Sequence, residues 1–117
     1  MTGTRDDPVR APTRVRVEPI GIDLDVRPDE TVMAAALRVG LTWPTLCHGK
    51  AECAVCALKV VDGLPGAVER GERERDALRR YKGITDQQRP EVRLACQLRV
   101  TAPLVVRKPG VRRAGTG

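Results

Sequence analysis

Two short stretches in which apolar and polar residues alternate begin the regular pattern of the chain. In residues 13–18 (TRVRVE) and 22–27 (IDLDVR), every second position is apolar. This period of two is typical of strands with one buried face. Pro19 and Gly21 lie between the two stretches and favour a turn, so the pattern predicts a β-hairpin. Its buried positions are expected to be Val15, Val17, Ile22, Leu24 and Val26.

Apolar positions with helical spacing follow in the segment PDETVMAAALRVGL. Asp29 is the expected N-cap, Glu30 falls in the first turn, and Gly40 is suited to the C-terminal end. The segment therefore predicts a helix of about ten residues, close to the usual helix length. Its buried face is expected to contain Val32, Ala35, Ala36 and Val39.

A second helix is predicted over 69–81 (ERGERERDALRRY). Its apolar stripe is narrow and consists of Ala77, Leu78 and Tyr81. The pairs Glu69–Arg73 and Asp76–Arg80 have i,i+4 spacing, which supports an exposed helix modestly.

The remaining segments predict strands and one irregular stretch. Residues 41–55 (LTWPTLCHGKAECAV) have no regular period, whereas 57–63 (ALKVVDG) reads as a strand ending in an Asp-Gly turn. Residues 91–100 and 102–107 predict one or two further strands, with a break near Pro103. The resulting order is hairpin, helix, irregular loop, strand, helix, strand, which fits an α+β fold with a small mixed sheet and one packed helix.

Composition limits the size and character of the core. The chain has 117 residues, which suits one domain, and its only aromatic residues are Trp43 and Tyr81. The core must therefore be built from Val, Leu, Ile and Ala. We expect one domain over 15–106, an irregular N-terminal arm over 1–14 and a basic C-terminal tail over 107–117.

The net charge of +6 comes mostly from the ends of the chain, because the tail holds four Lys/Arg and no acid. The lack of aromatic residues for base stacking argues against nucleic-acid binding. No apolar stretch approaches the roughly 20 residues of a membrane span, and residues 1–14 do not resemble a signal peptide. We therefore expect a cytoplasmic protein without membrane contacts, and in that reducing compartment cysteines favour metal or redox roles.

The four cysteines form the pattern C-x5-C-x2-C-x39-C: Cys47, Cys53, Cys56 and Cys96. Three close cysteines and one remote one match the plant-type [2Fe–2S] layout, with one extra residue in the first gap. Zinc sites usually combine two short Cys pairs, and only Cys53/Cys56 is such a pair. His48 is the only histidine, which excludes a Rieske centre. Zinc and disulfides remain open as alternatives at this point.

Small residues lie beside the cysteines, as a cluster would require. Two ferric ions, two sulfides and four thiolates sum to a charge of −2, which falls to −3 on reduction. Such charge needs peptide N–H groups close to the sulfur atoms, and small side chains permit that approach. The small neighbours are Gly49, Ala51, Ala54 and Ala95.

The cysteine spacing together with RLACQ (93–97) resembles the adrenodoxin/putidaredoxin-like branch of the [2Fe–2S] ferredoxins. The resemblance covers about 15–106 and implies a β-grasp fold with an irregular cluster-binding loop. It implies that Cys47, Cys53, Cys56 and Cys96 bind a [2Fe–2S] cluster. It also implies a monomeric electron-transfer protein, not an enzyme, that carries single electrons from a flavoprotein ferredoxin reductase to an oxygenase such as a cytochrome P450.

The second predicted helix departs from that branch, whose members usually carry an acidic docking patch there. Here acidic and arginine residues alternate along the helix. The alternative function is an iron–sulfur redox-sensing or regulatory subunit that uses its basic tail (107–117) to bind a partner.

Overall fold

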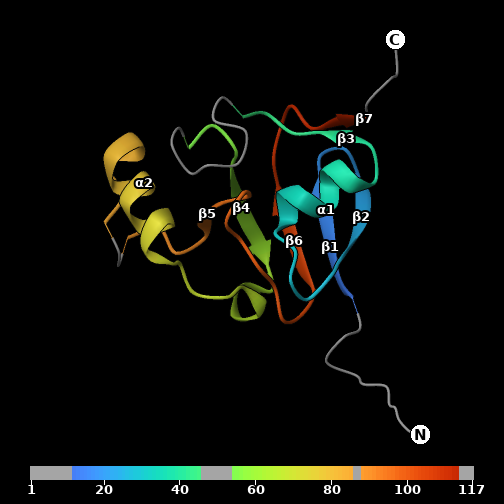
Figure 1. Cartoon of the computed structure of the whole chain (residues 1–117), viewed down its shortest axis with the longest axis horizontal. Coiled ribbons are helices and arrows are strands. Elements are labelled where there is room, and N and C mark those ends of the chain that lie inside the picture. Colours follow the sequence, from blue (N-terminus) through green and yellow to red (C-terminus); the bar gives the residue numbers. More distant parts are fainter. Residues whose placement is uncertain (1–11, 46–53, 86–87, 114–117) are drawn as a thin grey trace, which may run out of the picture.

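The fold is built around a five-stranded mixed sheet, seen in a computed structural model that describes residues 12–45, 54–85 and 88–113 (Figure 1). The strand order is β2-β1-β6-β4-β5. The strands span Thr13–Glu18 (β1), Ile22–Val26 (β2), Ala57–Asp62 (β4), Val92–Leu94 (β5) and Leu104–Arg107 (β6). This arrangement confirms the predicted α+β class and is that of a β-grasp fold.

The predicted hairpin is confirmed, because β1 and β2 pair antiparallel with Val15 opposite Leu24. β1 also pairs parallel with β6, whereas β4 runs antiparallel to both β5 and β6. The alternation in β1 and β2 buries Val15, Val17 and Leu24 almost completely. One face of the sheet is therefore apolar, as the period of two predicted.

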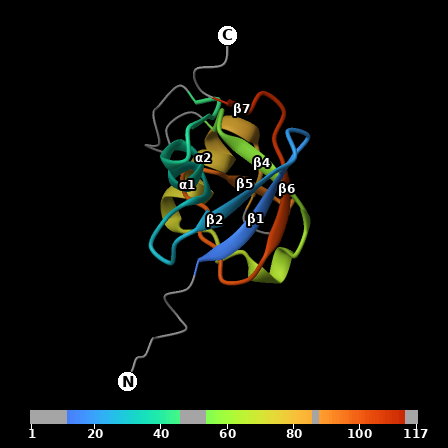
Figure 2. The same ribbon diagram turned by 90° about the vertical axis from the view of Figure 1, so that its right-hand side faces the viewer.

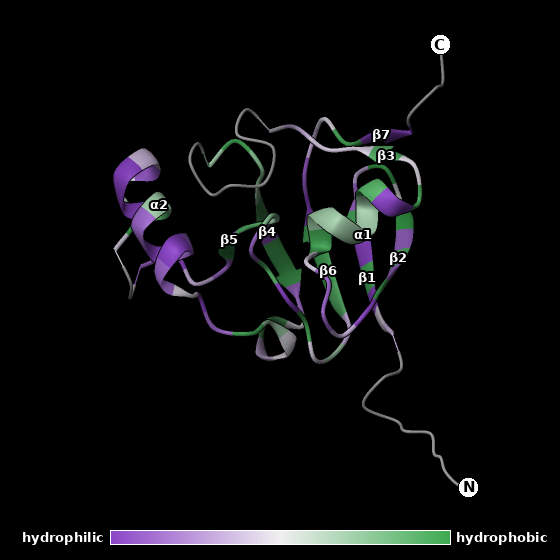
Figure 3. Cartoon of the chain, viewed as in Figure 1, coloured by the Kyte–Doolittle hydropathy of each residue, from purple (hydrophilic) through white to green (hydrophobic). Residues whose placement is uncertain are grey.

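Helix α1 (Val32–Arg38) packs against β2 and lies across the sheet, as Figure 2 also shows. The apolar strands and the largely polar outer helix α2 (Glu72–Lys82) are clearly distinguished by hydropathy in Figure 3. Between β4 and α2 lies a short 3-10 helix, η2 (Leu64–Gly66). Gly63 precedes it with φ of 84°, and a side chain at this position would collide with the carbonyl oxygen of Pro103.

The start of α1 differs from the prediction. Thr31 is the N-cap, not Asp29, because its side-chain oxygen accepts a hydrogen bond from the Ala34 N–H at 3.1 Å. Glu30 lies before the helix, where its carboxylate is paired with Arg38. The prediction of a buried Val39 is also wrong, since Val39 is the C-cap residue and is 51% exposed.

Helix α2 begins three residues later than predicted, so Glu69 lies outside it. The prediction that Glu69 and Arg73 form an i,i+4 pair on this helix is therefore wrong. The pair Asp76–Arg80 does form, at 3.3 Å. Ala77 and Leu78 are buried as predicted. Tyr81, the third residue of the predicted apolar stripe, is not buried, because its side chain faces solvent with 46% of its surface exposed.

Two short strands extend the fold beyond the main sheet. β3 (Leu41–Thr42) lies in the stretch predicted to be irregular, and it pairs antiparallel with β7 (Arg112–Arg113). Two-residue strands have no readable period in a sequence, which is why the pattern did not reveal them. Among the described residues, no helix is both long and apolar enough to cross a bilayer.

Candidate cluster-binding site

Cys56 and Cys96 lie at the same end of the β4–β5 pair. Cys56 immediately precedes β4, and Cys96 lies in the turn that follows β5, not within a strand as predicted. Because Ala57 pairs with Leu94 in antiparallel register, residue 56 is level with residue 95. Both cysteine side chains are buried, with 1% and 7% of their surface exposed. The fold therefore brings together two cysteines that are 40 positions apart in the chain.

The first turn of α1 holds the turn that contains Cys96. The N–H groups at a helix start have no partner inside the helix and need one elsewhere. Here Val32 N donates to the carbonyl of Leu98 at 2.9 Å, and Met33 N donates to the carbonyl of Ala95 at 3.0 Å. The turn also closes on itself, because Leu98 N donates to the carbonyl of Leu94. Cys96 thus sits in a turn whose backbone is bonded from two sides.

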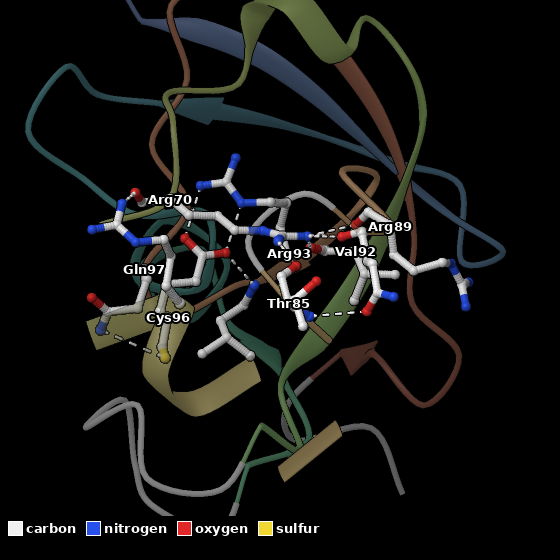
Figure 4. Close-up of polar contacts among 11 residues, drawn as sticks. Arg70, Thr85, Arg89, Val92, Arg93, Cys96 and Gln97 are labelled. Atoms are coloured by element: carbon white, nitrogen blue, oxygen red, sulfur yellow. Dashed lines mark hydrogen bonds and ion pairs between the residues drawn. The ribbon is translucent and has the colours of Figure 1, made fainter. Parts of the chain in front are cut away.

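A buried ion pair ties α2 to the strand before Cys96 (Figure 4). Arg93 donates from Nε and Nη2 to the two carboxylate oxygens of Glu74, at 2.6 and 2.8 Å. The same carboxylate accepts from the backbone N–H of Leu94 at 2.9 Å. Both side chains are almost fully buried, at 1% and 4% exposed. Paired geometry of this kind compensates the cost of burying two charges.

Arg70 joins the chain before α2 to the start of β5 and the segment before it, as Figure 4 also shows. Its guanidinium donates to the carbonyl oxygens of Gln88 at 3.2 Å and Val92 at 3.0 Å. Arg75 in turn donates to the Arg70 carbonyl at 2.7 Å. Close to the cysteine itself, the amide of Gln97 lies 3.8 Å from Cys96 Sγ and can donate a hydrogen bond to it.

Different contacts hold Cys56. The buried Trp43 side chain donates from Nε1 to the Cys56 carbonyl at 3.0 Å. Lys108 Nζ donates to the carbonyl of Val55 at 2.8 Å. Partial burial lowers the pKa of Lys108, and nearby Cys56 acts in the opposite direction. Ala54 begins this segment in the left-handed region, with φ of 57°.

The structure thus describes two of the four predicted ligands, and it brings Cys56 and Cys96 together. Cys47 and Cys53 lie outside the described residues, as do His48, Gly49 and Ala51. Within 12–45, 54–85 and 88–113 no three potential metal-binding side chains gather.

Sequence reasoning missed the supporting roles of Glu74 and Trp43. The period of α2 could have indicated Glu74, because positions 74, 77, 78 and 81 share one helical face, but acidic residues are rarely buried unless paired.

The described part of the site fits a thiolate-bound cluster. Its two cysteines face the same end of the sheet from separate elements, and the small residues Ala54 and Ala95 beside them are buried. Two carbonyl groups of the Cys96 turn, those of Ala95 and Leu98, accept hydrogen bonds from α1, so the protein itself positions the turn.

A comparison with protein families decides the identity of the domain. Residues 15–101 match the model of the 2Fe-2S iron-sulfur cluster binding domain. The chain belongs to the [2Fe–2S] ferredoxin family. The ferredoxin from Escherichia coli K12 is similar, with 37% identity over 92 residues that cover 78% of this chain and 79% of the relative.

Solved structures agree with this assignment. The ferredoxin from Rhodopseudomonas palustris HaA2 is 28% identical, with a TM-score of 0.59 over 87% of this chain and 98% of that one. The Amycolatopsis cytochrome P450 reductase GcoB is 27% identical, with a TM-score of 0.68 over 87% of this chain. The matched region is only 28% of the GcoB chain, so the likeness concerns one part of a longer protein. As a ferredoxin, this chain is an electron carrier whose cofactor is a [2Fe–2S] cluster.

Proposed function

We propose that Cys47, Cys53, Cys56 and Cys96 are the four ligands of the cluster. The observation that carries this proposal is the joint burial of Cys56 and Cys96 at one end of β4 and β5. Cys47 and Cys53 complete the three-plus-one spacing of a [2Fe–2S] site. In this proposal residues 15–106 form the cluster domain, preceded by the arm (1–14) and followed by the basic tail (107–117), from which Lys108 bonds the segment before Cys56.

We further propose that the protein takes single electrons from a flavoprotein ferredoxin reductase and passes them to an oxygenase such as a cytochrome P450. The likeness to GcoB supports this, because that protein is itself a cytochrome P450 reductase. When bound, a [2Fe–2S] cluster takes up and releases one electron. The role of the polypeptide is to hold the thiolates, exclude water from the buried sulfur atoms and present a docking surface. No catalytic residue is needed for this role, and we propose that the protein acts as a monomer in the cytoplasm.

To test the ligand assignment, each cysteine is replaced by serine in turn, and each purified variant is then reconstituted anaerobically. We expect each variant to lose most of its iron and acid-labile sulfide, or to show an altered electron paramagnetic resonance spectrum after reduction. Thr42→Ala, an exposed substitution close to Trp43 in sequence, is the control and keeps the wild-type spectrum. A variant such as Cys47→Ser with unchanged iron content and spectrum would remove that residue from the ligand set.

The carrier role is tested with the reduced holoprotein and purified reductase and oxygenase candidates from the same genome. We expect oxygenase turnover to require both the reductase and this protein. Turnover that proceeds at the same rate without the protein would contradict the proposed place between the two enzymes.

A further inference from the structure

A groove of about 550 Å³ lies between the C-terminal end of α2 and the adjoining strands β4, β5 and β6. Five basic residues line it, and none of the described residues that line it carries a carboxylate. The basic residues are Lys59, Lys82, Arg89, Arg107 and Lys108. The groove therefore concentrates positive charge on one face of the protein, although residues 15–106 together are nearly neutral.

Most of these basic side chains have no ion-pair partner within the described part of the chain. Arg89 is paired with Glu91 at 2.8 Å, just outside the groove. Lys59, Lys82 and Arg107 have no carboxylate within ion-pair distance among the described residues, although the charge of Lys59 interacts with that of Glu91 at longer range. Lys59 and Arg107 are also direct neighbours across the β4–β6 pair. Like charges in such positions destabilise a sheet, so this pair lowers the stability of the fold and is not explained by folding alone.

The groove also offers apolar surface. Tyr81 lines it with 46% of its surface exposed, whereas the lining residues Leu58 and Ile84 are almost fully buried and leave little apolar surface free. Exposed aromatic rings among basic residues are typical of protein interfaces. The groove contains a single aromatic residue, whereas nucleic-acid binding without sequence motifs relies on several rings for stacking.

The groove reaches the end of the sheet that holds the cysteines. Ala57 lines the groove and directly follows Cys56. Lys108, another lining residue, donates its hydrogen bond to the carbonyl of Val55, which directly precedes Cys56. A molecule seated in the groove would therefore lie beside a proposed cluster ligand. Short distance to the cluster is what an electron-transfer partner requires.

We propose that this basic groove is the docking site for an acidic surface segment of a redox-partner protein. The inference rests on the proposed carrier function and names the chemistry of its partner. Carboxylates of the partner would neutralise Lys59, Lys82 and Arg107, and an apolar side chain would cover Tyr81. The proposal thus inverts the charge pattern implied by the resemblance, in which the ferredoxin supplies the acidic face.

The first test measures binding of a fluorescein-labelled decaglutamate peptide to the oxidised holoprotein by fluorescence anisotropy. Replacing Lys59 and Lys82 together by glutamate should weaken binding at least about tenfold at low salt. The matched control replaces Arg14 and Arg27 by glutamate, an equal change in charge near the β2 edge, at the opposite side of the sheet. Thermal unfolding of both variants verifies that they are folded.

Equal weakening in both double variants would overturn the proposal, because it would show only an effect of net charge. A labelled decathymidylate provides a second comparison. If this nucleic acid binds the wild-type groove about tenfold more tightly than the peptide, the choice of a protein partner is overturned.

The second test separates the groove from the carrier function. The reduced holoprotein is oxidised by hexacyanoferrate(III), an anion, or by hexaamminecobalt(III), a cation, in a stopped-flow experiment at low salt. The Lys59→Glu/Lys82→Glu variant should react roughly tenfold more slowly with the anion and faster with the cation, whereas the control changes little. Unchanged rates with both reagents would overturn the proposal that the groove lies beside the cluster. A protein that reacts with neither reagent would instead contradict the carrier function, while the peptide experiment would still report on the groove.

Discussion

The two described cysteines reach the same end of the sheet in different ways. Cys96 lies in a turn bonded to the start of α1, and the strand before it is anchored by the buried Glu74–Arg93 pair. Cys56 lies at the start of β4, where its carbonyl accepts a hydrogen bond from Trp43. One cysteine is thus held by two helices and an ion pair, and the other by a strand end and single side chains.

This difference suggests that the two regions depend unequally on the cluster. The Cys96 turn is closed by its own hydrogen bonds and has two carbonyl groups bonded to α1, so it can form before metal is present. The Cys56 segment begins with Ala54 in the left-handed region, a conformation that costs a residue with a side chain roughly 1 kcal/mol. Because binding free energy of a metal becomes folding free energy, the cluster should stabilise the Cys56 region more.

The largest expected effect comes from removing the acid of the buried pair. Glu74→Ala leaves the Arg93 guanidinium buried without its partner, and we expect a loss of about 3–5 kcal/mol in the free energy of unfolding. Urea denaturation of the holoprotein measures this. Glu72→Ala, an exposed change on the same helix, should change stability by less than about 0.5 kcal/mol.

A double variant, Glu74→Leu with Arg93→Met, shows whether the uncompensated charge causes that loss. Replacing both partners by apolar residues should recover part of the stability, because the buried charge is gone but the Leu94 N–H still lacks its acceptor. A double variant as unstable as Glu74→Ala would mean that the unpaired charge of Arg93 is not the cause of the loss, and that the shape of the pair and the acceptor for the Leu94 N–H hold β5 and α2 together.

An intermediate effect is expected on the Cys56 side. Trp43→Phe removes the donor to the buried Cys56 carbonyl, which should cost about 1–3 kcal/mol. The visible absorbance of the cluster should also decay faster in mild urea than in the neighbouring control Thr42→Ala. A variant that unfolds earlier but keeps its cluster as long as wild type would show that Trp43 stabilises the core without supporting the site.

The smallest effect is a pH dependence carried by Glu30. The hydrogen bond from Arg38 is the main cause that lowers the pKa of Glu30 to about 2, with a further contribution from the Arg27 backbone N–H. Because the pKa is below its usual value, the stabilisation is fully present above about pH 4.5 and is lost as the pH falls toward 2. This pair steadies α1, whose first turn holds the Cys96 turn.

The comparison is made by urea unfolding at pH 6 and pH 4. Wild type should lose more stability between these two values than Glu30→Gln, which cannot ionise at this position. An equal loss in the two proteins would assign the acid sensitivity to other groups.

Much of the fold could be predicted from local pattern, and the failures have specific causes. The β1–β2 hairpin followed from alternation over five or six residues, which carries a clear period, and β4 followed from a strand-like segment that ends in an Asp-Gly turn. The strand β3 has two residues and therefore no period. The N-cap was misplaced because Asp29 and Thr31 are both good caps, and only the hydrogen bond from the Ala34 N–H to the Thr31 side chain distinguishes them.

At the site, the sequence alone yielded the proposed set of four cysteines, the type of cluster that their spacing suits and the class of fold, because these depend on residue identity and short-range period. Tertiary structure alone decided which charged residue is buried, since Glu74 looks like its exposed neighbours until Arg93 arrives from a distant strand. It likewise decided that Tyr81 faces outward and that Lys59 and Arg107 meet across two strands. Contacts between residues far apart in the chain depend on how the elements pack, and a local pattern holds no information about that.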